Sequence, residues 1–538
     1  MYRLAHYEAG RTTRTNATVT LLALLAGLVL ALHSGYKAPP AAATIDCNIG
    51  EVDNVTPPTI TPTGNVANSR VLSMVSHGSW SVCGGGTITS YNYQWVHDDA
   101  ATPIPGKTST SYTVSQTTDV AHLIELSVQA CDSVGDCSDY VASSNWAALG
   151  FYPTKAVDFP CFQTTYNNQN RTDIVNELAA AHVRQVRIVA PWLSIETNNG
   201  VYSSTALSRL YTCISDITTA NTTPKMSVIV SVFDTPSWAQ TAYPSQDRVK
   251  TVPPSDCLSS TASCASISNF MATLTNDLFG QGYTWSQFSY EIWNEANNRT
   301  FWTPACNNGS GWHKCSEGPP PETNYNSNAH HQYVYLTTAA YNAVKQCSLT
   351  NCLTGHPDAV TVATGGALAN WSTVNYITMT AWNSYIYSDW CGGSGSTCRD
   401  TNPPPWDVIA LHPYPNQSSG GCPYVSTAFT YVPTVATTMS AYGDSRLPIW
   451  FTEYGWADDH LGTYCSDLNQ GSRLTDALTY PNVPDTVRDE VWWVSDEKFI
   501  DNSSCTSFYC YTYILNWDSG TDTFGEESIY SYLQSAPQ

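Results

Sequence analysis

Two glutamates in this chain have surroundings that suit acid–base chemistry. Glu295 comes two residues after the apolar segment Phe288–Trp293, and Glu453 directly follows the apolar segment Leu447–Thr452. Paired carboxylates suit the hydrolysis of a glycosidic bond, because one gives a proton to the leaving oxygen while the other, ionised, attacks the sugar or activates water. A lone glutamate at the end of a strand more often caps the strand or pairs with a cation. The prediction therefore depends on an architecture that brings both carboxylates together.

The segments around these glutamates predict that architecture. From residue 149 to 538, apolar strand-like segments alternate with helical stretches such as 330–346, in which apolar residues recur at steps of three and four. Eight such strands are the count of a (β/α)8 barrel. The alternative is a doubly wound sheet, but no glycine-rich phosphate loop follows any early strand. We therefore predict an α/β fold with a (β/α)8 TIM barrel, whose strands are 155–159, 185–190, 225–232, 288–293, 359–363, 406–411, 447–452 and 509–515.

A barrel places its catalytic groups just past the carboxyl ends of its strands. In this interpretation Glu295 follows the fourth strand and Glu453 the seventh, so both face the same mouth of the barrel. Six further residues on these strands or after them are candidates for binding the substrate. The aromatic rings among them offer flat apolar faces to the C–H groups of a sugar, although packing in the barrel is an equal alternative for each ring. The six candidates are Arg187, Asn294, His412, Tyr414, Trp238 and Trp517, and Trp302 and Trp456 are further aromatic candidates.

At these strand ends the sequence resembles a known group of enzymes. The segment Tyr290–Trp302 resembles the acid/base segment of clan A retaining glycoside hydrolases, and its Phe-Trp ending is most similar to glycoside hydrolase family 39. The segment Pro448–Trp456 resembles the nucleophile segment of the same enzymes. The similarity runs over most of 155–520, and one departure is Ala296, where the family often has proline. Supporting matches are 195–202, 235–239, 340–345 and 411–414.

The resemblance implies a double displacement in which Glu295 is the general acid/base and Glu453 is the nucleophile. An ionised Glu453 nearby and partial burial would both raise the pKa of Glu295 and keep that group protonated. The charge of Arg187 would lower the pKa of Glu453 and hold its carboxylate ready to attack.

The same resemblance implies roles for the residues around the pair. Tyr414 would donate a hydrogen bond to Glu453, and Asn294 would hold the 2-hydroxyl of the sugar, a contact that strengthens as the oxocarbenium-like state forms. His412 would line the same subsite, with a structural histidine at a strand end as the alternative. The mechanism needs no cofactor, and no set of metal ligands is visible in the sequence. The acidic run Asp458–His460 is expected to be a solvated loop.

These features predict a secreted retaining glycoside hydrolase that cleaves β-type O-glycosidic bonds of a polysaccharide or oligosaccharide, with xylosidase-like action. One alternative is an endo-β-glucanase or mannanase of the family 5 type, which shares both catalytic glutamates. An alternative of another class is a non-catalytic cell-surface protein for carbohydrate binding or adhesion. Binding alone needs no acid/nucleophile pair, so the presence of both glutamates argues against that class. A carbohydrate is the expected partner in every case.

The charge of the chain excludes another class of partner. Its 538 residues include 44 acidic and 22 basic ones, which gives a net charge of −22. A nucleic-acid binder needs basic patches that displace counterions from phosphate, so we expect no nucleic-acid partner. Aromatic residues make up 12% of the chain, and so many rings exclude disorder over most of its length.

The first 148 residues predict two further parts. Basic residues precede the apolar run Ala17–Leu32, and small residues follow at 41–43, so we expect a secretory signal peptide over 1–43, with an uncleaved anchor as the alternative. No later stretch is apolar enough to predict an integral membrane domain. Short alternating segments over 44–148 predict an all-β region. It resembles bacterial Ig-like modules, because Cys83, Trp95 and Cys131 have the order of a core disulfide and a buried tryptophan. A plain spacer and a carbohydrate-binding module are both open interpretations of this region.

The chain has 18 cysteines, many of them close neighbours. None forms the paired CxxC pattern of a zinc ribbon, so we predict disulfides and an oxidising, extracellular compartment. Nine Asn-x-Ser/Thr sequons also occur. A glycan at Asn298, three residues after Glu295, would crowd the site, so we expect that sequon to be unoccupied. The predicted cysteine pairs are Cys131–Cys137, Cys257–Cys264, Cys306–Cys315, Cys347–Cys352, Cys391–Cys398, Cys505–Cys510 and Cys422–Cys465.

Overall fold

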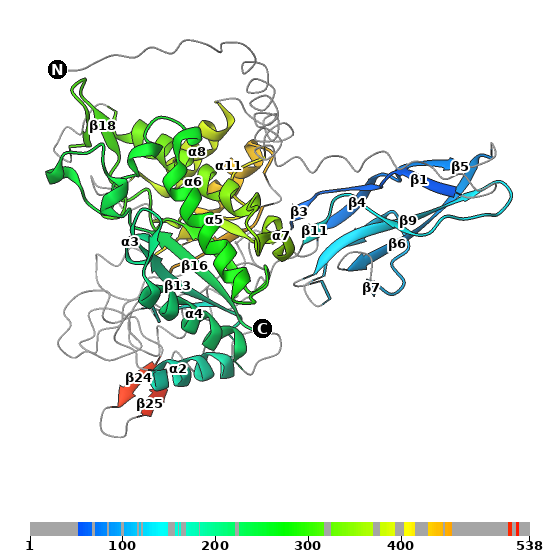
Figure 1. Cartoon of the computed structure of the whole chain (residues 1–538), viewed down its shortest axis with the longest axis horizontal. Helices are drawn as coiled ribbons and strands as arrows, with labels where there is room; N and C mark the ends of the chain where they lie inside the picture. The colour runs from blue at the N-terminus through cyan, green and yellow to red at the C-terminus, as the bar shows by residue number, and fades with distance from the viewer. Residues whose placement is uncertain are drawn as a thin grey trace, which may run out of the picture. The chain divides into compact units, whose positions relative to one another are not determined.

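The computed structural model describes most of the chain from 52 to 454 and two short strands near its end (Figure 1). Within that range the described residues are interrupted at 67–69, 83–85, 98–101, 116–117, 120–121, 149–155, 160, 163–167, 182, 221–224, 317–323, 369–376, 393–402, 415–428 and 445–446. Beyond 454 only 515–518 and 523–526 are described. The expected leader at 1–43, the run Asp458–His460 and Trp456 lie outside the described residues.

The region from 52 to 148 consists of β-strands that pair almost entirely in antiparallel fashion. Its two longest strands, β6 (Ile88–His97) and β9 (Leu123–Asp132), are neighbours along nearly their whole length and place Trp95 opposite Leu126, both fully buried. They belong to a sheet of order β3-β11-β9-β6-β7 with β10 on β9, beside a sheet of order β2-β4-β8 and the pair β1-β5. The remaining strands are β1 (Val52–Thr56), β2 (Thr59–Thr61), β3 (Gly64–Asn65), β4 (Val71–Ser76), β5 (Ser79–Val82), β7 (Thr102–Pro103), β8 (Ser111–Thr113), β10 (Val141–Ala142) and β11 (Ala147–Ala148).

The disulfide expected from the Ig-like pattern, Cys83 with Cys131, is wrong. Cys131 is bonded to Cys137, with 4.1 Å between their Cα atoms. The reason is local: the chain turns tightly after β9, Cys137 returns beside Cys131 as an isolated antiparallel bridge, and a sulfur can form only one disulfide. The alternative pairing that the close spacing predicted is therefore the one that forms.

The region from 156 to 454 contains a parallel sheet whose strands follow one another in chain order. Five strands pair as β12-β13-β16-β17-β20, three pair as β21-β22-β23, and a parallel bridge between Ala363 and Val408 connects the two sets. Doubly wound sheets reverse their strand order at a switch point, and no reversal occurs in the described part of this sheet. The strands are β12 (Ala156–Asp158), β13 (Gln185–Pro191), β16 (Ser227–Phe233), β17 (Phe288–Ile292), β20 (Val362–Thr364), β21 (Ala367–Leu368), β22 (Ile409–His412) and β23 (Ile449–Phe451).

Two of the predicted barrel strands differ from the structure. The segment predicted at 359–363 becomes a strand only at Val362, because Pro357–Ala359 forms a short 3-10 helix, η5, with proline in its first turn. The eighth predicted strand, 509–515, lies mostly outside the described residues. Its last residue belongs to β24 (Leu515–Asp518), which pairs in antiparallel fashion with β25 (Thr523–Glu526). The described residues thus give eight parallel strands of an α/β fold, in one set of five and one set of three.

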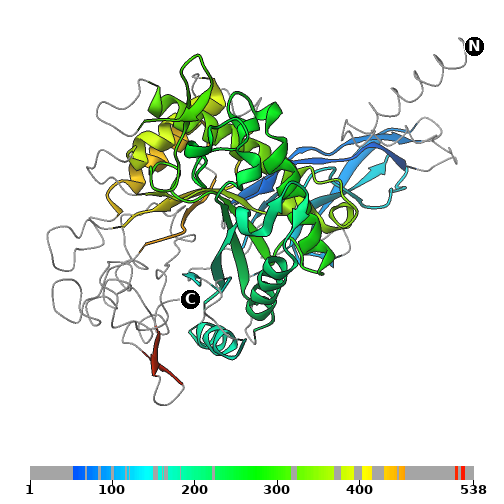
Figure 2. The ribbon, with the colours of Figure 1, turned by 60° about the vertical axis from the view of Figure 1, so that its left-hand side comes forward.

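Helices lie beside these strands in Figures 1 and 2. The predicted helix at 330–346 is confirmed as part of α6 (Tyr325–Lys345), whose buried residues include Tyr333, Leu336, Ala340 and Val344. The other long helices are α2 (Asn168–Ala180), α4 (Ser204–Thr219), α5 (Ala265–Gly280), α8 (Met379–Cys391) and α11 (Val432–Ala441). The shorter elements are α3 (Trp192–Ile195), β14 (Glu196–Asn198), β15 (Val201–Tyr202), η1 (Ser237–Ala239), η2 (Ser245–Asp247), η3 (Ser255–Cys257), η4 (Thr261–Ser263), β18 (Ala305–Asn307), β19 (Trp312–Lys314) and α7 (Cys352–Gly355).

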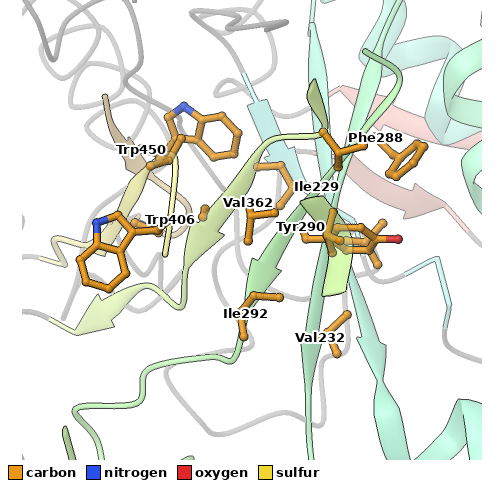
Figure 3. Close-up of a cluster of buried hydrophobic side chains, with 14 of the residues drawn as sticks. Ile229, Val232, Phe288, Tyr290, Ile292, Val362, Trp406 and Trp450 are labelled. Carbon is orange, nitrogen blue, oxygen red and sulfur yellow. The ribbon is translucent and has the colours of Figure 1, made fainter. Parts of the chain in front are cut away.

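The two faces of the parallel sheet have different compositions. On β17, Phe288, Tyr290 and Ile292 point to one side, and Tyr290 accepts a hydrogen bond from Thr275 of α5. This face joins a cluster of buried apolar side chains from neighbouring strands (Figure 3). Ser289 and Glu291 alternate with them and therefore point to the other side. The face toward the helices contributes apolar side chains to the buried core, and the opposite face carries polar groups.

Four of the predicted disulfides are confirmed: Cys131–Cys137, Cys257–Cys264, Cys306–Cys315 and Cys347–Cys352. A further disulfide joins Cys161, just after β12, to Cys213 of α4, at a sequence separation of 52 residues that the close-neighbour argument did not cover. The other predicted pairs include cysteines outside the described residues. Such disulfides are consistent with an oxidising compartment. In the described part of the chain, no helix has both the length and the apolar character that crossing a bilayer would require.

Candidate functional site

Arg187 on β13 is the centre of a buried network of charges. Its Nε donates to Glu291 at 2.7 Å, and its Nη1 donates to Glu453 at 2.7 Å and to Asp158 at 3.0 Å. The side chain is only 1% exposed. Burial lowers the pKa of Arg187, but the charges of Glu291, Glu453 and Asp158 outweigh that effect and raise the pKa well above its usual value. Arg187 is therefore a permanent cation that draws three strand ends together.

The second guanidinium nitrogen of Arg187 orients the residue before the acid/base candidate. Nη2 donates to the Oδ1 atom of Asn294 at 2.9 Å and to the hydroxyl of Ser231 on β16 at 3.1 Å. With its amide oxygen held by the cation, Asn294 has a fixed orientation at the end of β17. The structure thus brings Arg187 and Asn294 together, a contact that the sequence did not predict.

Glu453 lies just past β23 and accepts hydrogen bonds on both carboxyl oxygens. Oε1 accepts from Arg187, and Oε2 accepts from the Tyr414 hydroxyl at 3.2 Å. The Nδ1 atom of His412 is 3.5 Å from the same Oε2. Donors and cations on three sides stabilise the negative charge that a nucleophilic carboxylate carries.

Glu295 lies past the end of β17 in a strained turn. Its φ is +43° and that of Trp293 is +77°, values in the left-handed region that non-glycine residues seldom adopt. Strain of this kind is retained where the surrounding structure fixes it, often at functional sites. The turn buries the Glu295 carboxyl, whose Oε2 accepts from the amide of Asn298 at 2.7 Å.

The environment of Glu295 favours its protonated form more than water does. Burial raises the pKa of Glu295, and the negative charge of Glu453 raises it further, while contacts with His412 and Asn298 partly offset these effects. The two glutamates therefore have different surroundings. Glu295 is buried and has a raised pKa, whereas Glu453 accepts hydrogen bonds from the cation Arg187 and from the hydroxyl of Tyr414. A pair with this asymmetry suits one proton donor and one anion.

His412 at the end of β22 connects the two carboxylates. It is fully buried, and its Nδ1 lies 3.0 Å from Oε1 of Glu295, while its Nε2 lies 3.2 Å from the Thr452 hydroxyl. Burial lowers the pKa of His412, but the surrounding charges and hydrogen bonds of Glu453, Glu291 and Glu295 outweigh it and raise the pKa to about 10. His412 is thus a second buried cation of the site and more than a neutral lining residue.

The separation of the two carboxyl groups can be bounded. One oxygen of Glu295, one oxygen of Glu453 and a ring nitrogen of His412 all lie within 4.8 Å of one another. A retaining pair of carboxyl groups is about 5–5.5 Å apart, whereas an inverting pair leaves about 6.5–9.5 Å for a water molecule. The spacing in this chain agrees with the shorter class.

Sequence reasoning missed the residue that links both cations. Glu291 is fully buried on β17; its Oε1 accepts from the hydroxyl of Thr452 at 2.6 Å and from the backbone N–H of Gly366 at 3.2 Å. Burial raises the pKa of Glu291, but the charge of Arg187 and contacts with His412 and Thr452 lower it to about 2. The available signal was the strict polar–apolar alternation of Phe288–Ile292, which places a carboxylate on the face opposite the helices. Asp158 and Thr452, which also belong to this network, were not predicted either.

The aromatic residues that were predicted to bind sugar differ in their burial and contacts. Trp238, in η1, is partly buried, donates its Nε1–H to the carbonyl of Glu196 at 3.1 Å and meets Trp192 edge to face. The prediction that Trp302 offers a sugar-binding face is wrong, because this ring is 1% exposed, packs edge to face on Trp293 and donates to the carbonyl of Ala329. Trp517 lies on β24, and its side chain is outside the described residues.

Gly366 leaves no room for a side chain beside His412. A Cβ atom added there would lie 2.0 Å from the Nε2 atom of His412, far inside contact distance. We expect Gly366→Ala to displace the imidazole from Glu295 and lower kcat/KM on the order of a hundredfold, the cost of about 1 Å of misplacement. Steady-state kinetics with a circular-dichroism check of folding measures this. Gly280→Ala is the control, because its Cβ would meet only the end of the Asn351 side chain; equal kinetics for Gly366→Ala and the control would contradict the assignment.

The sequon at Asn298 is predicted to carry no glycan. Its side chain is buried, with the amide nitrogen on Glu295 and the Oδ1 atom accepting from the backbone N–H of Thr300 at 2.9 Å. A sugar would be attached to the same Nδ2 atom that contacts Glu295, and no space is open beside this buried atom. Peptide mass spectrometry of the folded protein from a glycosylating host should find Asn298 bare and the exposed sequon at Asn308 modified. A glycan on Asn298 of the folded protein would contradict the geometry.

Comparisons with known proteins give similarity at low sequence identity. No protein-family model and no curated protein matches the chain. Among solved structures, it is similar to a family 39 glycoside hydrolase from the gut symbiont Bacteroides cellulosilyticus WH2, with 13% identity, coverage of 89% of this chain and 81% of that one, and a TM-score of 0.45. A monomeric β-xylosidase from Caulobacter crescentus CB15 has 12% identity, coverage of 72% and 68%, and a TM-score of 0.45. A family 1 β-glucosidase from Thermotoga maritima has 11% identity, coverage of 72% and 98%, and a TM-score of 0.42.

Proposed function

We propose that this protein is a retaining glycoside hydrolase that cleaves β-type O-glycosidic bonds by double displacement. The observation that carries the proposal is the pair Glu295 and Glu453, at the ends of two parallel strands, with an oxygen of each within 4.8 Å of the other. Their surroundings differ: the pKa of Glu295 is raised, whereas Glu453 accepts a hydrogen bond from the guanidinium of Arg187. Structural ion pairs do not need this asymmetry. An acid/base and a nucleophile do.

In the first step, the Glu453 carboxylate attacks the anomeric carbon of the sugar while Glu295 gives its proton to the departing oxygen. The glycosidic C–O bond breaks, and a glycosyl ester forms on Glu453. In the second step Glu295, now a carboxylate, takes a proton from water as that water attacks the anomeric carbon. The ester C–O bond breaks, the sugar leaves, and both glutamates return to their starting protonation states.

The charge network compensates for the loss of negative charge on Glu453 during the first step. Arg187 keeps Asp158 and Glu291 as counter-anions after Glu453 becomes an ester, so no unpaired cation remains buried. The Tyr414 hydroxyl, which contacts Glu453, is placed to hold the reacting oxygen, and Asn294 is assigned to the sugar 2-hydroxyl. Trp238 and Trp517 are assigned to stacking on sugar rings.

The substrate class follows from this chemistry, and product analysis tests it. We propose a polysaccharide or oligosaccharide of β-linked units as the substrate, with xylosidase-like action first among the options. The purified protein is mixed with xylan, glucan, mannan, arabinan and aryl glycosides, and the first product is followed by proton NMR. A released sugar with retained anomeric configuration supports the proposal. Saturable binding without any product would favour an adhesion protein, and inversion would refute double displacement.

We also propose that residues 44–148 form an Ig-like module and that 149–538 form the catalytic barrel of a secreted protein. In support, Asn145 exchanges two hydrogen bonds with the backbone of Ile60, and β11 ends at Ala148 inside the β-sheet region. A truncated chain must therefore start after Ala148. We expect a chain beginning near residue 149 to fold and to keep its rate on aryl glycosides, measured beside the full chain. A folded but inactive truncation would show that the module contributes to the site.

A further inference from the structure

A second cluster of titratable side chains lies on the helices, apart from the residues of the proposed active site. His330 and His331 are consecutive residues of α6, and Asp389 belongs to α8; these helices are neighbours (Figure 1). One carboxyl oxygen of Asp389 contacts the Nδ1 atom of His330, and the other lies 3.0 Å from the Nε2 atom of His331. The carboxylate of Asp389 therefore contacts both imidazoles, one with each oxygen.

The cluster is well shielded for a surface feature. The side chains of His330 and Asp389 are 12% and 11% exposed, and that of His331 is 44% exposed. One ligand atom from each residue lies within 4.8 Å of the other two. A tetrahedral zinc ion binds nitrogen and oxygen at about 2.0–2.2 Å, and three protein ligands leave its fourth position for water. Three converging ligands and one partly open side fit this coordination.

The orientation of His331 is fixed by a further contact. Its Nδ1 atom lies 3.1 Å from the hydroxyl of Ser327, one turn earlier on α6. A hydroxyl that occupies one ring nitrogen leaves the other, Nε2, to face Asp389. Metal-ligating histidines generally have such a partner on the second nitrogen, which fixes the ring orientation.

We propose that His330, His331 and Asp389 form a binding site for a divalent transition-metal ion, with Zn²⁺ as the best match. Two imidazoles and one carboxylate suit zinc and its neighbours Co²⁺ and Ni²⁺ better than Ca²⁺ or Mg²⁺, which prefer oxygen ligands throughout. The bound ion would link α6 to α8. The site is separate from the proposed hydrolysis, because none of its three ligands belongs to the group of Glu295, His412 and Glu453.

Zinc titration of the metal-stripped full chain tests the proposal. Isothermal titration calorimetry with ZnCl2 should give one ion per chain, and Zn²⁺ should raise the midpoint of thermal unfolding. Asp389→Asn and His331→Gln should weaken binding on the order of a hundredfold and abolish the thermal shift. Substituting Co²⁺ should give the visible absorption of a tetrahedral site in the wild type and not in these variants. His77→Ala, which removes a histidine of the β-sheet region, is the matched control and should bind as the wild type does.

One other group of ligands must be distinguished, because Glu295, His412 and Glu453 also lie within 4.8 Å of one another. Glu453→Gln removes a ligand there and leaves α6 and α8 unchanged, so this variant should still bind one zinc ion. Binding lost in Glu453→Gln but kept in Asp389→Asn would overturn the proposal. So would wild-type affinity in folded Asp389→Asn and His331→Gln, or no binding by the wild type at 100-fold excess of zinc.

Discussion

Alanine in place of either Glu295 or Glu453 is expected to lower the rate on natural glycosides on the order of a hundredfold or more, the scale of lost acid–base assistance. The two variants should differ on aryl glycosides with good leaving groups. An activated leaving group needs little protonation, so Glu295→Ala should still form the glycosyl ester with it. Glu453→Ala has no nucleophile and should form none. Single-turnover kinetics on both substrate types measures this difference.

The pH profile separates the two roles further. The pKa of Glu295 is raised, and the acid acts in its protonated form, so the rate of the wild type should fall as pH rises through that pKa. Glu295→Ala should lack this alkaline decline with activated substrates. Glu177→Gln on α2 is a control for changing a glutamate and should keep the wild-type profile. An unchanged alkaline decline in Glu295→Ala would assign the titrating group elsewhere.

Glu291→Gln is expected to cost both stability and activity. The pKa of Glu291 is lowered from 4.5 to about 2, which corresponds to about 3 kcal/mol of stability at neutral pH. This contribution is present above pH 4.5 and is lost as pH falls toward 2. Urea unfolding at pH 7 should therefore find the variant less stable than the wild type by about 3 kcal/mol, with a smaller difference at pH 3. Activity should also fall, because Arg187 and His412 lose a shared anion.

The control for this prediction is again Glu177→Gln, which exchanges the same groups outside the network. A stability difference between Glu291→Gln and the wild type that is constant from pH 7 to pH 3 would contradict the ionised state of Glu291. Wild-type activity in Glu291→Gln would show that the contacts of Glu291 with Arg187 and His412 do not position the catalytic groups.

For strand β17, the sequence predicted the strand itself but not the partners of its residue Glu291. The pattern of Phe288–Ile292 predicted a strand ending beside Glu295, since apolar residues facing the helices are a local signal. The partners of Glu291 were not predicted, because they come from β13, β22 and the residue after β23, and only the packing of these strands against one another sets the distances. Arg187 and Glu453 are 266 residues apart in sequence. The contact between Arg187 and Glu453 was predicted from the barrel hypothesis and the family resemblance. Neither of these pointed to Asp158 or Thr452.

Residues after the strands were harder to predict. Trp302 and Trp238 have the same residue type and similar positions past a strand, yet the first is enclosed by Trp293 and Tyr333 and the second is partly exposed. The difference lies in their long-range contacts: Trp302 donates to the carbonyl of Ala329 at the start of α6, whereas Trp238 donates to the carbonyl of Glu196. Contacts with segments distant in sequence leave no local signal in the residues around either tryptophan.

Covalent labelling tests the central claim most directly. A mechanism-based fluorosugar with a good leaving group is incubated with the wild type, and the digested protein is analysed by tandem mass spectrometry. We expect one sugar ester, located on Glu453, that also forms in Glu295→Ala and is absent from Glu453→Ala. A label on Glu295, or turnover of the reagent without any covalent intermediate, would contradict it.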